Sequence, residues 1–544
     1  MRLHRAALLL VVLIAVALRV PGLSWGIPSP DFFLAKSPEG QNLVVLGPEP
    51  SPPGSHIYSF HPDEIFPVRA AARIALTGDP NPHFFNYGSL YIYLLAPLLR
   101  PFRPLMPLDT AHLIARLLTV TFSIATILLT YRIGKRLYNH RIGLLAACLI
   151  AVAPLHVVHS HFATVDVPLT FFTTLALAFS LSALQSQRLR HFLLAGAAAG
   201  LAASTKYSGL LSLVLPLAAL LVPNKEFPLA RRLGAALAVL AASGAAFLIT
   251  CPFSILSPQD FLADVRFEFS HLAHGGTTAF LNTAPAPVYH LLNSLPNGLG
   301  PFLLVASLLG LGLALCRRQP GEWLLFLWTI LSFAGASLSH EKFIRYMLPT
   351  LPCLALLASR LAILRRKAWR SLAFGLLGIS ALSAALISVA HLHYLLAPDA
   401  RSTAAQWVLK RAAKGTLIGL PEFPWFFTPP VTPYNGGSRL SGEEFPAWNQ
   451  RAANPLVIAD WNPAPLAQNP PRFVILSDVE VKHRLRTGDL QARKFLDFLH
   501  SDYRLAAGFG SKPRIFGLPL VSKYPPPDWE YHDPIIRVYQ RPGA

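Results

Sequence analysis

The apolar run IGLLAACLIAVAPLHVV, residues 142–158, decides the fold class of this chain. It contains no Asp, Glu, Lys or Arg, and its 17 residues approach the roughly 20 that an α-helix needs to cross the hydrocarbon core of a bilayer. Lys135 and Arg136 precede the run, whereas Asp166 follows it. The stretch therefore predicts a membrane helix with one basic end and one acidic end.

The composition of the whole chain agrees with this interpretation. Of its 544 residues, 53% are hydrophobic and only 14% are charged, whereas soluble globular proteins carry about 25% charged residues. A net charge of +20 would indicate nucleic-acid binding in a soluble protein, but here the basic residues fall in short loops between apolar runs, as in the cytoplasmic loops of membrane proteins. We therefore predict a polytopic membrane protein that binds the lipid bilayer and no nucleic acid. The basic loops contain Lys135-Arg136, Arg188 and Arg190, Arg231-Arg232, Arg317-Arg318 and Arg365-Arg366-Lys367.

Other apolar runs are also long enough to cross a membrane. The run 192–222 is too long for one span and is interrupted at 204–209, so we predict two short helices that meet at an outer turn. The first run is predicted as a membrane helix rather than a cleaved signal, because no clear small-residue cleavage site follows it. The total is about eleven membrane helices, with the N-terminus in the cytoplasm and the C-terminus outside. The nine runs predicted as single spans, 142–158 included, are 6–23, 110–131, 142–158, 165–184, 233–250, 288–315, 322–338, 344–364 and 370–396.

The character of the chain changes after residue 396, where apolar runs shorten and prolines and tryptophans multiply. Helix and strand patterns then alternate, and the Pro-, Asn- and Gly-rich stretch 421–470 is predicted as loops. We therefore predict a membrane domain over residues 1–396 and an extracytoplasmic α/β domain over 397–544. The patterns predict helices at 403–413 and 493–503, strands at 416–420, 472–476 and 535–540, and a short interfacial helix at 87–99.

The first candidate site is the acidic pair Asp63 and Glu64, which follows the first apolar run in the stretch FHPDE, residues 60–64. A carboxylate can take the proton from a hydroxyl as it becomes a nucleophile, and a neighbouring acidic residue or histidine can orient it or hold a divalent cation. The alternative is structural, because proline and acidic residues are favoured in the first turn of a helix. The pair alone leaves both interpretations open.

The second candidate is Asp166, a lone carboxylate at the outer edge of the run 165–184. Asp is a good residue at the start of a helix, which is the structural interpretation. Three histidines precede Asp166 and no Lys or Arg lies nearby, so a cation site is the alternative. The histidines are His156, His159 and His161.

Two basic residues depart from the positive-inside pattern, Lys206 in its outer turn and Arg345 in the stretch 340–349. Cations at the outer edge of a membrane suit an anion that arrives from the lipid, such as a phosphate group. Side chains that snorkel at helix ends are the alternative explanation. His271, on an external amphipathic segment, is a weaker candidate.

Taken in order, these residues resemble membrane glycosyltransferases of the GT-C class, in the bacterial branch related to protein O-mannosyltransferases and to the aminoarabinose transferase of lipid A. The resemblance covers residues 6–396, and the tail looks like the variable periplasmic domain that such proteins often carry. Relatives commonly have paired prolines where this chain has Tyr87-Gly88-Ser89. The motifs that carry the resemblance are Asp63-Glu64, 86–93, the Asp166 turn, Thr205-Lys206 and 345–349.

This resemblance implies that the protein transfers a sugar from a polyprenyl-phosphate donor to a lipid, glycan or protein acceptor, with inversion at the anomeric carbon. The reaction would take place on the outer face of the inner (plasma) membrane. By the same resemblance Asp63 would be the general base, Glu64 and Asp166 would orient the acceptor or a cation, and Lys206 and Arg345 would hold the carrier phosphate.

Further residues follow from the same resemblance. Tyr87, Tyr346 and His61 are implied to bind substrate. Metal dependence differs among relatives, so a divalent metal ion stays open as a cofactor. Its candidate ligands are Asp63, Asp166, His161 and His271.

A rival interpretation is a transporter or flippase of a lipid-linked saccharide with an external binding domain. Such a protein is expected to place ionisable residues or broken helices near the middle of the membrane. The predicted spans are nearly free of carboxylates, and Arg116 is the main charged exception. We therefore expect a glycosyltransferase.

Overall fold

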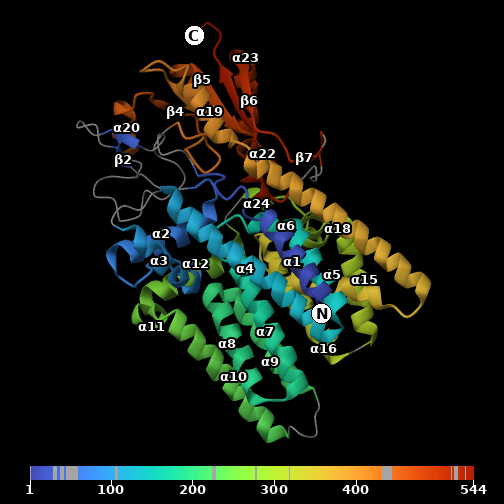
Figure 1. Ribbon diagram of the computed structural model, residues 1–544. Helices are drawn as coiled ribbons and strands as arrows, with labels where there is room; N and C mark the ends of the chain where they lie inside the picture. Colours follow the sequence, from blue (N-terminus) through green and yellow to red (C-terminus); the bar gives the residue numbers. More distant parts are fainter. Residues whose placement is uncertain are drawn as a thin grey trace.

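The computed structural model is a bundle of helices with a small β-sheet at one end (Figure 1). The long helix α18 (Lys367–Leu396) runs along the bundle and leads into the sheet-bearing part. The structure describes residues 2–27, 34–36, 42–44, 59–103, 108–222, 228–275, 278–317, 319–431, 444–515, 517–519, 525–532 and 534–543.

Within these residues, five helical segments are long and apolar enough to cross a membrane, and a bent pair counted as one span would make a sixth. This confirms a helical membrane protein, and the total of about eleven membrane helices stays a prediction. The five segments are Asp109–Leu137, Asp166–Ser186, Leu229–Thr250, Ile344–Ile363 and Lys367–Leu409. Shorter apolar helices cover His4–Ala17, Leu90–Phe102, His140–Val152 and Tyr207–Leu221.

The helices of the bundle follow the apolar runs of the sequence. In chain order they are α1 (Arg2–Ala17), α2 (Pro62–Thr77), α3 (Leu90–Leu99), α4 (Leu108–Leu137), α5 (His140–Val152), α6 (Pro154–His159), α7 (Asp166–Ser186), α8 (Leu189–Thr205), η3 (Tyr207–Leu213), α9 (Val214–Leu221), α10 (Leu229–Thr250), α11 (Phe253–Leu256), α12 (Pro258–His274), α13 (Ala286–Tyr289), η5 (His290–Ser294), α14 (Leu295–Leu299), α15 (Pro301–Arg317), α16 (Pro320–Ser337), η6 (Ile344–Thr350), α17 (Leu351–Ser359), η7 (Arg360–Ile363) and α18.

Three of the predicted runs contain a break. The interruption predicted within 192–222 is confirmed, because Lys206 has an extended backbone between α8 and η3. The run 142–158 was predicted as one helix, but Ala153 is extended between α5 and α6, as expected for a residue before proline. The run 288–315 is also not one straight helix: its two halves meet at an angle of 116° around Gly300, whose φ of +81° suits glycine.

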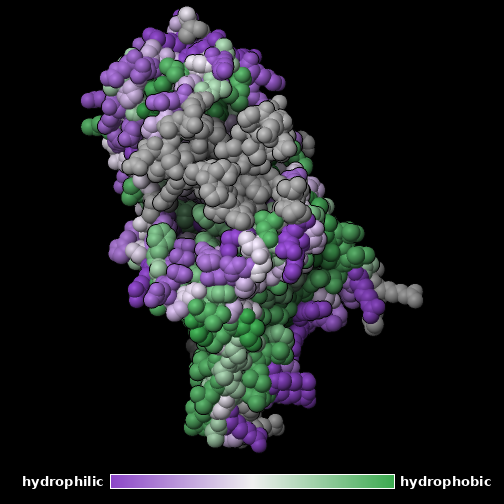
Figure 2. All heavy atoms as spheres, turned by 90° about the vertical axis from the view of Figure 1, so that its left-hand side faces the viewer, coloured by the Kyte–Doolittle hydropathy of each residue, from purple (hydrophilic) through white to green (hydrophobic). Residues whose placement is uncertain are grey.

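The outer surface of the bundle is apolar. Figure 2 shows hydrophobic residues covering the lower part of the molecule, with hydrophilic residues gathered over the sheet-bearing part. In α10, only 17% of the most apolar 18-residue stretch is buried. In the segment Ile344–Ile363, 89% of the corresponding stretch is buried. Exposed leucines therefore cover α10, whereas the second segment lies inside the bundle. A wide apolar exterior of this kind suits lipid contact rather than water.

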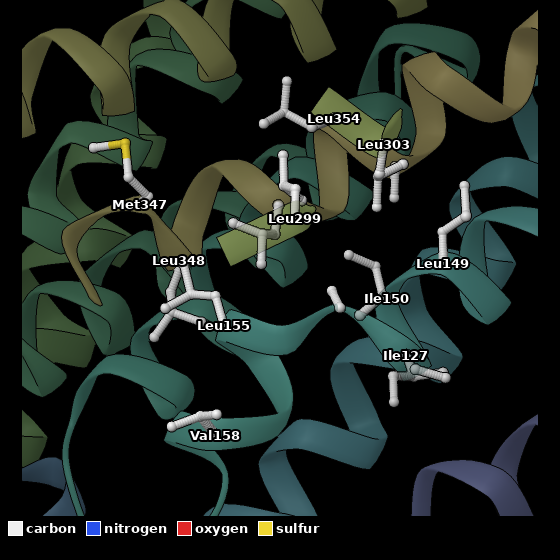
Figure 3. Close-up of a cluster of buried hydrophobic side chains, with 14 of the residues drawn as sticks. Ile127, Leu149, Ile150, Leu155, Val158, Leu299, Leu303, Met347, Leu348 and Leu354 are labelled. Atoms are coloured by element: carbon white, nitrogen blue, oxygen red, sulfur yellow. The ribbon is translucent and has the colours of Figure 1, made fainter. Parts of the chain in front are cut away.

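The largest buried cluster packs helices that are far apart in the chain. Figure 3 shows side chains of α4, α5, α6, α14, α15, η6 and α17 pointing toward one another. Because this core joins α6 and η6, it fixes the ends of both elements relative to each other. The labelled residues are Ile127, Leu149, Ile150, Leu155, Val158, Leu299, Leu303, Met347, Leu348 and Leu354.

The C-terminal part forms a five-stranded sheet in the order β4-β3-β5-β9-β6, with β3 parallel to β4 and β5 and with β9 antiparallel to β5 and β6. Phe473 and Ile475 of β5 pack with α19, whereas Val474 and Leu476 pack with α21 and α23. This alternation is the one that a strand buried on both faces requires. The elements are α19 (Ala400–Leu409), β3 (Ile418–Leu420), α20 (Glu444–Arg451), β4 (Leu456–Ile458), α21 (Pro463–Gln468), β5 (Phe473–Ser477), α22 (Asp478–Arg486), α23 (Leu490–Asp502), β6 (Arg504–Phe509), α24 (Pro527–Glu530) and β9 (Ile536–Gln540).

All five elements predicted in the tail occur within a few residues of their predicted bounds. The loop prediction for 421–470 is wrong in part, because α20, β4 and α21 form there. β4 has only three residues, too few to show a strand pattern in the sequence, and it pairs with β3 in parallel. The short helix predicted at 87–99 is present as α3. The division of the chain into domains 1–396 and 397–544 stays a prediction.

Candidate functional site

Asp63 stands in the first turn of α2, directly after Pro62. Proline fits the first helical position, and an acidic residue there is favoured by the helix dipole. The local sequence therefore positions the carboxylate at the helix end, and 23% of its side chain remains exposed. It is the most accessible carboxylate of the cluster described below.

Asp166 and Lys206 meet across two neighbouring helices. Asp166 is the first residue of α7, and Lys206 follows the last residue of α8. The Lys206 ammonium lies 2.7 Å from Asp166 Oδ1. The carboxylate is nearly buried, whereas 18% of the lysine side chain is exposed, so the pair has one face that a ligand can approach.

Arg345 connects this pair to Asp63. Its Nη2 lies 3.1 Å from Asp63 Oδ2, and its Nε lies 3.8 Å from Asp166 Oδ2. The guanidinium of arginine is planar and always charged, and it can face several oxygens at once. Arg345 therefore joins Asp63 to Asp166, and Lys206 belongs to the same cluster through its contact with Asp166.

Asp528 of α24 is a further member of the cluster. Its Oδ2 lies 3.5 Å from Arg345 Nη1, and its two oxygens accept hydrogen bonds from the backbone N–H groups of Ile344 and Arg345, at 3.2 and 3.3 Å. Complete burial raises the pKa of Asp528 to about 6, although the Arg345 charge and these amides act in the opposite direction.

Aromatic rings line the two cations. The Lys206 ammonium lies 4.8 Å from the ring centre of Tyr346 and 5.7 Å from that of Tyr87, and the Arg345 guanidinium lies 3.9 Å from the ring centre of Phe343. Tyrosine and phenylalanine faces attract cations. Tyr87 and Tyr346 were implied as substrate-binding residues, and the structure places both beside Lys206.

The backbone next to Tyr87 approaches α8 very closely. A Cβ atom added to Gly88 would lie 2.0 Å from the carbonyl oxygen of Ser204, a distance at which no side chain fits. Ser204 stands two residues before Lys206. The absence of a side chain at Gly88 thus lets the Tyr87 loop reach the Lys206 turn.

Glu64 does not join this cluster, because its carboxylate is fully buried in an ion pair with Arg116. Arg116 Nε donates to Glu64 Oε2 over 3.1 Å, the backbone N–H of Ala163 donates to the same oxygen over 2.9 Å, and Ser59 donates to Oε1. Burial alone would raise the pKa of Glu64, but the charge and hydrogen bonds of Arg116 lower it to about 2. The charge of Arg116, unusual in a predicted span, is thereby explained.

His61 is also buried, inside an aromatic stack rather than at the exposed edge of the site. Its ring lies 4.4 Å from that of Phe162 and 5.7 Å from that of His532. Burial, together with the positive charges of Arg345 and Arg116, lowers the pKa of His61 despite the nearby carboxylates. His61 therefore forms part of the support behind Asp63.

The candidate metal ligands do not gather into one site. His161 has both ring nitrogens within 3.0 Å of backbone carbonyls, and His271 on α12 lies 3.9 Å from Glu341. Asp63 and Asp166 both face Arg345. Within the residues that the structure describes, no group of three or more His, Cys, Asp or Glu side chains is placed to hold a metal ion. The donor set of these described residues therefore does not fit a metal centre.

The sequence interpretation missed Asp528, together with Trp529 and His532 of the same segment. The stretch PPPDWE, residues 525–530, combines an acidic residue and a tryptophan with prolines, but nothing local links it to Arg345. Only the packing of α24 against the bundle makes that connection.

The chemistry that this arrangement permits follows from its charges. Three carboxylates, those of Asp63, Asp166 and Asp528, surround the two cations Lys206 and Arg345. Asp63 is the carboxylate that a hydroxyl group can reach. The two cations can attract an anion. The site can therefore combine proton removal from a hydroxyl with stabilisation of a negatively charged leaving group.

Comparison with protein families supports the resemblance inferred from the sequence. Residues 108–255 match the family model described as dolichyl-phosphate-mannose-protein mannosyltransferase. The matched part includes Asp166 and Lys206. A search of curated proteins finds no match.

Solved structures with a similar fold include the oligosaccharyltransferase of Archaeoglobus fulgidus. Its apo form has a TM-score of 0.50 and 13% identity over 95% of this chain and 75% of that one. The form tethered with an acceptor peptide has a TM-score of 0.52 and 12% identity over 95% and 74%. ArnT from Cupriavidus metallidurans, bound to undecaprenyl phosphate, has 15% identity over 98% and 97% of the two chains, with a TM-score of 0.46. The likeness to the oligosaccharyltransferase shows a shared fold, and with the family match it confirms the resemblance to GT-C glycosyltransferases.

Proposed function

We propose that this chain, similar in fold to GT-C glycosyltransferases, transfers a sugar from a polyprenyl-phosphate carrier to an acceptor hydroxyl with inversion at the anomeric carbon. The observation that carries the proposal is the contact of Arg345 with both Asp63 and Asp166, with Lys206 bound to the same Asp166. One accessible base and two cations thus stand together at the end of an apolar bundle.

In the proposed reaction, the acceptor oxygen forms a bond to the anomeric carbon while the bond from that carbon to the phosphate oxygen breaks. Asp63 takes the hydroxyl proton, and the polyprenyl phosphate leaves with the electron pair of the broken bond. General-base assistance of this kind contributes about 10²- to 10⁴-fold in rate. The 23% exposure of the Asp63 side chain supports its assignment.

Lys206 and Arg345 are proposed to hold the carrier phosphate and to stabilise the charge that grows on it as the sugar departs. Fixed cations in a water-poor site stabilise such charge better than mobile water does. Asp166 contacts both cations, so we assign it the task of orienting them. Tyr87 and Tyr346, which flank Lys206, are proposed to border the sugar or the phosphate.

Glu64 and His61 are assigned a supporting task instead of direct contact with substrate. Both side chains are fully buried. The Glu64–Arg116 pair holds the start of α2 against α4, and the stack of His61 on Phe162 supports the residues just before Asp63. The two residues would therefore position the general base.

The proposed location is the inner membrane of a bacterial cell, with the N-terminus in the cytoplasm and the sheet-bearing part in the periplasm. The exposed apolar face of the bundle supports membrane insertion, and the loops with Arg231-Arg232 and Arg365-Arg366-Lys367 support the orientation. The acceptor would then be a lipid, a glycan or a protein of the cell envelope.

The test uses the purified full-length protein in lipid nanodiscs, undecaprenyl-phosphate sugars labelled in the sugar, and envelope extract as the source of acceptor. Asp63→Asn should lower the transfer of label out of the carrier fraction by about 10²- to 10⁴-fold. Asp260→Asn is the matched control, because Asp260 is an exposed residue of α12 and should transfer like the parent protein.

Equal transfer by Asp63→Asn and the parent protein would reject Asp63 as the base. In closed proteoliposomes, movement of intact labelled carrier from one leaflet to the other, without a new glycosidic bond, would instead identify a flippase.

A further inference from the structure

The short helix α24 brings a distant part of the chain into the membrane half of the molecule. Asp528 and Trp529 are 0% and 2% exposed, and Trp529 belongs to the same buried cluster as residues of α5, α6 and η6. Figure 1 shows α24 where the sheet-bearing part meets the bundle. This segment is therefore part of the interior and not a surface loop.

Asp528 makes three contacts with two adjacent residues, two of them with Arg345 and one with Ile344. It accepts the backbone N–H of Arg345, pairs with the guanidinium of the same residue at 3.5 Å, and accepts the backbone N–H of Ile344. Hydrogen bonds that end on an ionised group are stronger than neutral ones. The carboxylate therefore fixes both the start of η6 and the direction in which the Arg345 side chain leaves it.

Neighbouring residues hold Asp528 in this position. Trp529 Nε1 donates to His159 Nε2 over 3.3 Å, and its ring lies 4.6 Å from that of His391 on α18. His532 stacks on Phe162 with 4.4 Å between ring centres. Because these contacts reach the segment just before Asp166 and the end of α18, the position of Asp528 is set by the bundle itself.

The acidic neighbour Glu530 has different partners. It pairs with Lys482 at 3.1 Å and lies 3.8 Å from His483, both on α22. Glu530 thus ties α24 back to the sheet-bearing part, whereas Asp528 faces the bundle. Of the two carboxylates on α24, only Asp528 meets the cluster that contains Asp63.

We propose that Asp528 is a positioning residue for transfer: it holds the Arg345 guanidinium between Asp63 and Asp166, so that the C-terminal part of the chain completes the phosphate-binding site. The inference rests on the proposed function, since it assigns a task to Arg345 in that reaction. It also makes a structural claim about Arg345 that can be measured without any sugar transfer.

The structural claim is tested by labelling the purified protein in nanodiscs with phenylglyoxal, which modifies arginine, and following Arg345 by mass spectrometry. Arg345 is 6% exposed in the parent protein and should react slowly. Asp528→Asn keeps the shape but places an amide N–H₂ against the donors of Arg345, so the reactivity of Arg345 should rise. Asp502→Asn, at the exposed end of α23, should leave that reactivity unchanged.

The functional claim is tested by the binding of radiolabelled undecaprenyl phosphate. Asp528→Asn should weaken binding about tenfold, the loss expected for hydrogen bonds to a charged group. In an Arg345→Ala background the same substitution should cost nothing more, because the residue on which it acts is gone. If Asp528 were only structural, the losses of binding free energy caused by Asp528→Asn and by Arg345→Ala would instead add.

Asp528→Glu keeps the charge but moves the carboxylate by one methylene group. It replaces Asp528→Asn in the binding test if that variant does not fold. It should bind undecaprenyl phosphate less well than the parent protein and better than Asp528→Asn. Unchanged Arg345 reactivity in both variants, additive losses, or tighter binding by Asp528→Asn would each overturn the proposal. Tighter binding would mean that Asp528 competes with phosphate for Arg345.

The two proposals fail in different ways. If the parent protein neither binds undecaprenyl phosphate nor transfers sugar, the proposed function is rejected, and the labelling result still decides whether Asp528 orients Arg345. If the parent protein does both and Asp528→Asn equals it, the assignment of Asp528 alone is rejected.

Discussion

The guanidinium of Arg345 lies 3.1 Å from the carboxylate of Asp63, although most helices of the bundle lie between α2 and η6 in the sequence. The contact joins the residue proposed to bind the leaving phosphate to the residue proposed to accept the proton. The two tasks are therefore coupled through one pair of side chains.

Arg345→Lys should weaken the binding of undecaprenyl phosphate even though the charge is kept. Arg345 faces Asp63, Asp166 and Asp528 with different nitrogens, and a lysine ammonium cannot reproduce that planar fork. We expect a loss of about 1.5–3 kcal/mol, the range for hydrogen bonds to charged groups, in equilibrium binding. Arg141→Lys, at an exposed position of α5, is the control. Normal carrier binding combined with lost acceptor binding would move Arg345 to the acceptor site.

Glu64→Gln should destabilise the protein rather than change its chemistry alone. The substitution leaves the buried Arg116 guanidinium without its counter-charge, and breaking a buried ion pair from one side costs about 3–5 kcal/mol. The midpoint of thermal unfolding in detergent should fall, while Asp260→Asn should unfold like the parent protein. An unchanged midpoint with lost transfer would instead support direct contact between Glu64 and substrate.

The same pair predicts how stability depends on pH. The pKa of Glu64 is lowered to about 2 in the folded protein from an ordinary value near 4.5. A depressed carboxylate pKa stabilises the folded state above the ordinary value, and this contribution is lost as the pH falls toward the folded value. Unfolding of the parent protein should therefore become easier between about pH 4.5 and pH 2, and Glu64→Gln should lack this part of the dependence.

Gly88→Ala should disturb the Tyr87 loop. The new methyl group would meet the Ser204 carbonyl at 2.0 Å, so the loop must move away from the Lys206 turn, and overpacking of this kind costs about 1–3 kcal/mol. We expect a lower unfolding midpoint and weaker carrier binding. Gly244→Ala in α10 is the matched control, because its methyl group meets no atom within 4 Å and alanine favours the helix by up to about 1 kcal/mol.

Reporter fusions test the orientation of the chain. A reporter that is active only outside the cytoplasm should be on when it is fused after Ala544 and off when it is fused after Arg232, at the basic start of α10. The opposite pair of results would place the Asp63 cluster on the cytoplasmic side and overturn the assignment of its substrates.

The sequence by itself determined the helical membrane class of the fold and pointed to four members of the candidate cluster. Long apolar runs without carboxylates are typical of buried or lipid-facing helices, because backbone groups in hydrocarbon must bond to one another. The run 233–250, for example, is present within α10. The same sparsity of charge made Asp63, Asp166, Lys206 and Arg345 conspicuous, since each is an exception at a helix end.

Tertiary structure decided which of these exceptions act together. Asp63 and Glu64 are adjacent and alike in sequence, yet α2 directs one carboxylate toward Arg345 and the other into a buried pair with Arg116. Asp528 carries no local signal at all, and it reaches Arg345 only because α24 packs into the bundle. Periodicity and local composition report the environment of a residue along its own helix or strand, whereas partners brought from distant segments depend on how those elements pack.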